Sequence, residues 1–152
     1  MIKLISVGKI KDKHLKALID DYALKISRYH KLEMIEVKDE SITTDEKKVL
    51  DTEASRVMEK ISNDEYVILL DLHGKMMDSV TFANKIDQLF VHYSKITFVI
   101  GGSLGLGNEL LNRANERLKL SEMTFLHQMT RLILLEQIYR GFKILNNETY
   151  HK

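Results

Sequence analysis

Short apolar runs alternate along the chain with longer segments in which apolar residues recur every three or four positions. The runs have the length of strands, and the first of them is closed by Gly8. Four strands are predicted: Ile2–Val7, Leu32–Val37, Tyr66–Leu72 and Lys95–Ile100. The third is nearly all apolar, as in a strand covered on both faces, and we expect it to end at His73-Gly74-Lys75.

The segments with helical spacing lie between and after these strands. Ser79 is placed to cap the third of them, and Leu120–Phe125 fits neither pattern clearly. The predicted helices are Lys13–Tyr29, Asp45–Lys60, Ser79–Tyr93, Asn108–Asn115 and His127–Leu145. The alternation predicts an α/β fold, with a mostly parallel sheet flanked by helices and a single domain over residues 1–152.

The last predicted helix is apolar around most of its circumference between Arg131 and Leu145. Such a helix must be covered on nearly all sides. A chain of 152 residues offers little protein to do so. We therefore expect two copies of the chain to pair through this helix, with burial inside one copy as the alternative.

The composition is that of a globular protein, with 44% hydrophobic and 30% charged residues. Cysteine is absent, which excludes disulfides, cysteine zinc sites and thiol nucleophiles and fits a reducing, cytoplasmic environment. No apolar stretch approaches the roughly 18 residues of a membrane helix. The six histidines show no paired spacing, so we expect no metal site.

The net charge is only +1, but the charges are unevenly distributed. Residues 1–31 carry eight Lys/Arg and three Asp/Glu, residues 32–100 carry eight and fourteen, and residues 101–152 carry seven and five. The two basic ends could form one face for a phosphate backbone. Ordinary solvated helix faces are the alternative interpretation.

Four of the seven glycines fall in the segment Gly101-Gly102-Ser103-Leu104-Gly105-Leu106-Gly107, between a predicted strand and a predicted helix. No register gives G-x-G-x-x-G. The P-loop spacing is met only in its first part, because Asn108-Glu109 stands where Lys-Ser/Thr is needed. The segment predicts a ligand-binding loop that is not of the dinucleotide or triphosphate type. A purely structural turn is the alternative.

Several segments together form a distinctive combination. They are Val7–Lys11, Leu69–Lys75, Phe98–Leu106, Leu120–Arg131, Glu136–Leu145 and Tyr150–Lys152. Over nearly the whole chain, the combination closely resembles the RlmH (YbeA-like) family of SPOUT methyltransferases.

The resemblance implies a SPOUT fold with a C-terminal trefoil knot and a homodimer. It also implies that S-adenosylmethionine methylates N3 of a pseudouridine in bacterial large-subunit (23S) ribosomal RNA, on assembled ribosomes. By the same resemblance, the cofactor-binding residues are Leu70, Gly101, Leu120, Ser121, Glu122, Met123, Thr124 and Phe125.

Methylation of N3 requires loss of the N3 proton, and a histidine has a suitable ordinary pKa for this task. His127 and His151 are therefore candidate bases, Tyr150 is a candidate for stacking on the target base, and Arg131 is a further catalytic candidate. Two alternatives stay open: a non-catalytic RNA- or ribosome-binding dimer, and a SPOUT methyltransferase that acts on transfer RNA.

Overall fold

A computed structural model describes all residues 1–152. Five parallel strands form one sheet in the order β2-β1-β4-β3-β5. Their bounds are β1 Ile2–Val7, β2 Leu32–Val37, β3 Tyr66–Lys75, β4 Ile96–Ile100 and β5 Glu116–Leu118. The all-parallel sheet flanked by helices confirms the predicted fold class, and the trefoil knot that the resemblance implies stays a prediction.

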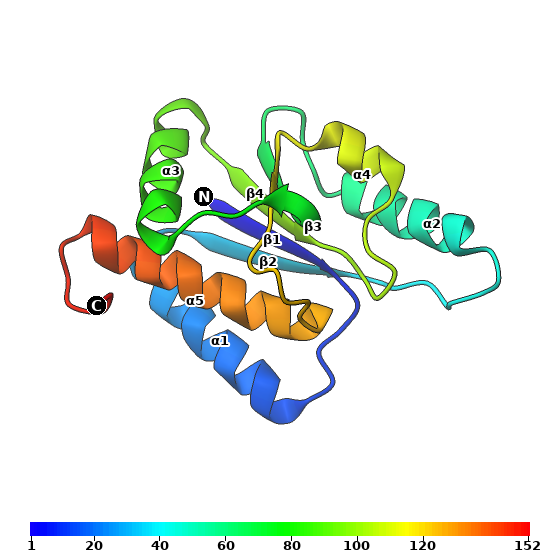
Figure 1. Ribbon diagram of the computed structural model, residues 1–152, viewed down its shortest axis with the longest axis horizontal. Coiled ribbons are helices and arrows are strands. Elements are labelled where there is room, and N and C mark those ends of the chain that lie inside the picture. The colour runs from blue at the N-terminus through cyan, green and yellow to red at the C-terminus, as the bar shows by residue number, and fades with distance from the viewer.

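Helices cover both faces of this sheet (Figure 1). The bounds are α1 Lys13–Ser27, α2 Glu46–Met58, α3 Ser79–His92, α4 Asn108–Arg113 and α5 His127–Leu145. Successive residues of β1 point to opposite faces, so Ile2 and Leu4 pack with α1, α3 and α5, whereas Ile5 and Val7 pack with α2 and α4. The predicted strand and helix patterns thus become two apolar layers around one sheet.

Helix α5 lies between α1 and α3 and buries one side of its apolar surface. Leu134, Leu135, Ile138 and Phe142 are buried against the sheet and the neighbouring helices. The other positions are mostly half-buried, and Met129 is 41% exposed. One copy of the chain therefore covers much of this helix but leaves part of its first turn open.

The carboxyl end of β3 differs from the prediction, which ended this strand at Leu72. The strand continues through His73-Gly74-Lys75 because β5 pairs with it across an irregular register, which is centred on Leu118. A Cβ at Gly74 would lie 2.7 Å from the Arg117 carbonyl, so glycine permits this close crossing. Strand β5 was not predicted, since its three residues carry no recognisable period.

The ends of α1, α2, α3 and α4 differ from the prediction by one or two residues, and so does the residue that caps α3. Asp78, and not Ser79, caps α3 by accepting a hydrogen bond from the Thr81 amide at 2.7 Å. Ser79 is already helical, and its hydroxyl donates to Gln137 Oε1 at 2.6 Å. Helix α1 ends at Ser27, two residues before the predicted end. The apolar spacing therefore located the helices, while local hydrogen bonds decided their last residues.

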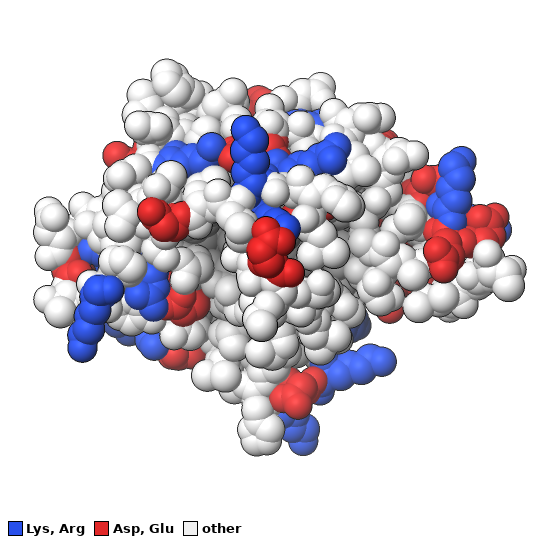
Figure 2. Space-filling model, in the orientation of Figure 1, with Lys and Arg blue, Asp and Glu red and all other residues white.

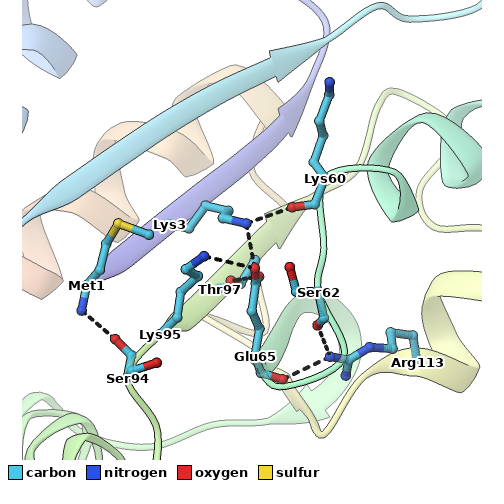
Figure 3. Close-up of polar contacts among 9 residues, drawn as sticks. All are labelled: Met1, Lys3, Lys60, Ser62, Glu65, Ser94, Lys95, Thr97 and Arg113. Atoms are coloured by element: carbon cyan, nitrogen blue, oxygen red, sulfur yellow. Dashed lines mark hydrogen bonds and ion pairs between the residues drawn. The ribbon is translucent and has the colours of Figure 1, made fainter.

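A buried polar network occupies the amino end of the sheet (Figure 3). Lys3 Nζ lies 2.7 Å from Glu65 Oε1 and donates to the Lys60 carbonyl at 2.6 Å. Thr97 donates to the second Glu65 oxygen, and Lys95 Nζ lies 3.3 Å from the first. The Glu65 side chain is fully buried, so this network ties β1, the start of β3 and β4 together away from water.

Candidate functional site

A cleft opens at the carboxyl end of the sheet, the edge where ligands bind in open α/β folds. Its volume is about 780 Å³, within the range of small-molecule sites. Three segments line it: the end of β3 at residues 70–73, the glycine loop at residues 100–106, and residues 117–121 and 123–127 together with Leu111 and Thr130. We call this space the cleft.

The glycine loop forms one wall of the cleft and is folded tightly on itself. The Gly105 amide donates to the Gly102 carbonyl at 3.1 Å, and Gly105 has a φ of +98°, which favours glycine. A Cβ at Gly101 would collide with the Gly105 carbonyl. Three glycines of this loop, Gly101, Gly102 and Gly105, line the cleft, so backbone without side chains faces it here.

The opposite wall is the irregular segment between β5 and α5. The Ser121 hydroxyl stabilises this segment by accepting a hydrogen bond from the Met123 amide at 3.0 Å. Leu120, Ser121, Met123, Thr124 and Phe125 all line the cleft.

Seven of the eight residues that the resemblance assigned to the cofactor thus share one cleft, since Leu70 and Gly101 line it as well. The exception is Glu122, whose mostly exposed side chain pairs with Lys119 at 2.7 Å.

His127 is the one predicted catalytic residue that lines the cleft. Burial lowers its pKa, the Arg131 cation lowers it further, and Asp39 opposes the shift. The ring is therefore uncharged at neutral pH and has a free lone pair. His127 does not cap α5, because Leu126 occupies the cap position and no side chain bonds there.

Arg131 lies outside the cleft lining and is 2% exposed. Its guanidinium donates to the Val7 and Gly8 carbonyls at 3.1 and 2.7 Å and to Glu36 at 2.7 Å. These contacts fasten α5 to the carboxyl end of β1. The arginine thus holds the start of α5, and with it His127, against the sheet.

Tyr150 and His151 lie in the tail that follows α5, outside the cleft. His151 lines a second cavity of about 470 Å³, which we call the tail cavity, together with Asp78, Ser79 and Phe125. Residues 118–120 and Phe125 line both cavities, so this segment separates them. Burial, with hydrogen bonds to Tyr22 and Glu136, raises the pKa of Tyr150, so its hydroxyl stays protonated.

Asp71, His73 and Arg117 also line the cleft, and the sequence analysis missed them. The Asp71 side chain is only 10% exposed, and its Oδ2 has no hydrogen-bond partner, although Arg117 Nη1 lies 3.6 Å away. An acidic residue near the end of an apolar strand was the signal that could have identified Asp71. Arg117 lies on the missed strand β5.

The cleft suits a ligand with apolar and hydrogen-bonding parts. Leu70, Leu106 and Leu120 supply apolar wall, bare backbone lines the glycine loop, and Asp71 supplies an acceptor. No group of three or more His, Cys, Asp or Glu side chains is placed to hold a metal ion. No helix is both long and apolar enough to cross a membrane.

Apolar side chains are exposed beside the cleft. Leu72, Met123 and Leu126 line it and are 56%, 75% and 62% exposed. On the face shown in Figure 2, a row of Lys and Arg side chains crosses the upper middle, an acidic group lies near the centre, and uncharged areas lie between the charges. The exposed apolar side chains beside the cleft are typical of a surface that contacts another molecule.

Comparison with known proteins decides the family. A family model described as "Predicted SPOUT methyltransferase" matches residues 1–151. This chain belongs to the SPOUT methyltransferase family. "Ribosomal RNA large subunit methyltransferase H" of Acetivibrio thermocellus is 49% identical over 99% of both chains, and the proteins of that name from Clostridium botulinum and Clostridium tetani are 48% and 45% identical over the same shares.

The SPOUT fold also has a solved counterpart. A structure from Haemophilus influenzae Rd KW20, "a probable methylase family protein", has a TM-score of 0.55 and 16% sequence identity. The likeness covers 99% of this chain and 70% of that one, and it concerns the fold alone. The family match identifies this SPOUT protein as a methyltransferase, so the cleft is its candidate active site.

Proposed function

We propose that this methyltransferase acts on N3 of a pseudouridine in large-subunit ribosomal RNA, with S-adenosylmethionine as the methyl donor. Relatives that are 45–49% identical over nearly their whole length bear the name of a large-subunit ribosomal RNA methyltransferase. The observation that carries the proposal is that seven of the eight expected cofactor residues line one cleft. Such a substrate places the enzyme in the cytoplasm.

The cleft residues fit the methyl donor. Leu70, Leu120 and Phe125 would hold its apolar parts, and the backbone at Gly101 would allow close approach. Asp71 Oδ2, which lies 3.6 Å from Arg117 Nη1 but accepts no hydrogen bond, would accept one from an amine or hydroxyl of the ligand. When bound, S-adenosylmethionine supplies an electrophilic methyl group.

His127 is the proposed general base. It lines the cleft, and burial keeps its pKa below the ordinary value, so the neutral ring can accept the N3 proton. Arg131 is proposed to act through His127 by holding the start of α5 in place. Tyr150 and His151 are proposed to contact the target base from the tail.

The enzyme is proposed to work as a homodimer joined through α5 and the cleft mouth. Met123, Leu126 and Met129 are exposed at the start of α5, where a second copy would cover them. Light scattering on the purified protein should give twice the chain mass of 17.7 kDa. Leu126→Asp should lower the measured mass to that of one chain. Val91→Asp, at an exposed apolar site on α3, should leave the dimer mass unchanged.

The activity test uses ribosomes from a strain that lacks this gene, incubated with the protein and labelled S-adenosylmethionine. Mass spectrometry of RNA fragments should locate one methyl group on N3 of a pseudouridine in the large-subunit RNA. His127→Gln should lower turnover by about 100-fold or more, since acid–base catalysis typically contributes 10²–10⁴-fold. His92→Gln, exposed at the end of α3, serves as the matched control.

Free RNA, large subunits and whole ribosomes are compared as substrates in the same assay. RNA binding without methyl incorporation would instead support the non-catalytic binding protein. Methylation of transfer RNA only would support the second alternative. Calorimetry should show S-adenosylmethionine binding at about one molecule per subunit or one per dimer, and no heat at millimolar cofactor would overturn the proposal.

A further inference from the structure

The chain after α5 is held back against that helix by specific contacts. Asn147, at a φ of +54°, turns the chain, and the Tyr150 hydroxyl donates to Glu136 Oε1 at 3.0 Å. The Tyr150 ring packs edge-on against Tyr139 at a centroid distance of 5.0 Å. The Arg140 guanidinium lies over the same ring, 4.8 Å from its centre. The tail is therefore built onto the helix and has a defined position.

A continuous chain of polar side chains fixes the Arg140 guanidinium. Ser79 donates to Gln137 Oε1 at 2.6 Å, and Gln137 Nε2 donates to Glu136 Oε2 at 2.8 Å. Arg140 donates through Nε and Nη2 to Glu136 Oε1, the former at 3.1 Å. Both Glu136 oxygens accept hydrogen bonds, and two Arg140 nitrogens donate to the same carboxylate. The third guanidinium nitrogen, Nη1, therefore points in a fixed direction.

That third nitrogen meets His151. Arg140 Nη1 lies 3.2 Å from His151 Nδ1. A guanidinium has donors and no acceptor, so Nδ1 must accept this hydrogen bond, and the neutral ring must carry its proton on Nε2. This contact is made by Nδ1 and leaves Nε2 available to a ligand.

We infer that Glu136 and Arg140 are positioning residues that hold His151 as the Nε2–H tautomer, so that the ring offers a hydrogen-bond donor and not a base. This inference rests on the proposed function and deepens it. Loss of the N3 proton from a pseudouridine places negative charge on the two carbonyl oxygens beside N3. A fixed N–H donor directed at such an oxygen stabilises that charge. Residues 118–120 and Phe125 separate the two cavities within one chain, so the N3 proton then goes to His127 in the cleft of the second copy of the proposed homodimer.

The first experiment measures the tautomer directly in the full-length protein. Long-range ¹H–¹⁵N correlation spectra of the ¹⁵N-histidine-labelled protein, with His151 assigned by comparison with His151→Gln, should show the Nε2–H pattern above the pKa of the ring. Arg140→Leu should give a mixture of tautomers, whereas Arg140→Lys, which keeps a cationic donor, should retain more of the Nε2–H form. Tyr22→Phe, which removes only a 3.4 Å hydroxyl contact to Tyr150, is the matched control.

An Nδ1–H ring in the unmodified protein, or an Arg140→Leu spectrum identical to it, would overturn the inference. The spectra do not depend on activity. A correct tautomer in a protein that fails to methylate RNA would refute the proposed function alone.

The second experiment separates donor from base by activity. The amide nitrogen of glutamine can replace an Nε2–H donor but cannot act as a general base at neutral pH. His151→Gln should therefore keep the acidic limb of the pH–kcat profile and retain more activity than His151→Ala, which should lose about 100-fold in kcat, as when one such donor is removed. Equal losses in both variants, with disappearance of the acidic limb, would assign His151 as the base and contradict the inference.

Discussion

The buried network around Glu65 gives the sharpest test of how this fold is held together (Figure 3). Glu65→Gln keeps the shape of the side chain, so no cavity forms, but the charge is lost and an NH2 group replaces one of the two acceptor oxygens. Lys3, whose side chain is 5% exposed, would then keep the Lys60 carbonyl as its one strong partner. Removing one member of a buried ion pair costs about 3–5 kcal/mol, because the other charge stays buried. In a chain of this length, each kcal/mol lowers Tm by about 2–4 °C, so the expected loss is roughly 10 °C.

The pH dependence of this loss has a defined sign. Burial by itself raises the pKa of Glu65, but hydrogen bonds from Lys3 and Thr97 outweigh it and hold the pKa below the ordinary 4.5. The carboxylate therefore stabilises the folded state above about pH 4.5, and this contribution is lost as the pH falls through the lowered pKa. Urea unfolding of both proteins between neutral and acid pH should show the difference in unfolding free energy shrink on acidification.

Two further variants separate the buried pair from the charges around it. Lys95→Met removes a cation that is 29% exposed, so it should cost less than about 1 kcal/mol. The double replacement Lys3→Met with Glu65→Leu should recover most of the stability lost in Glu65→Gln, because no unpaired charge stays buried. A Glu65→Gln protein that melts within about 2 °C of the unmodified one would refute this reasoning.

Three other changes have expected outcomes of different kinds. Gly101→Ala should weaken S-adenosylmethionine binding about tenfold or more in calorimetry, because a Cβ there collides with the Gly105 carbonyl and distorts the loop; unchanged affinity would show that the loop can adjust. Gly141→Ala should stabilise α5 by up to about 1 kcal/mol, since its Cβ would lie at an ordinary 3.6 Å from Ala83, and a lower Tm would contradict this packing. Because the pKa of His127 is lowered in the folded protein, the unfolded chain binds a proton at this residue more readily, so acidification below pH 6.5 should lower the free energy of unfolding. The same shift should place the acidic limb of the pH–rate profile below pH 6.5. A limb above that pH would exclude His127 as the base.

The sequence by itself determined the layers of this protein. Alternate residues of a strand face opposite sides, and helical residues recur every 3.6 positions, so both patterns are local properties of the chain. They were sufficient to predict four strands, five helices and the α/β class. The glycine loop was also recognisable, because only glycine allows the close backbone contact between Gly101 and Gly105.

The tertiary structure decided what depends on contacts between distant residues. Strand β5 exists because it pairs with β3, and this pairing brings Arg117 beside Asp71 in the cleft. Arg131 could be identified as a candidate from the sequence. Only the packing of α5 against β1 shows that its side chain is buried, donates to the Val7 carbonyl and lies away from the cleft. Neither outcome has a local period or motif, since each is fixed by where another part of the chain comes to lie.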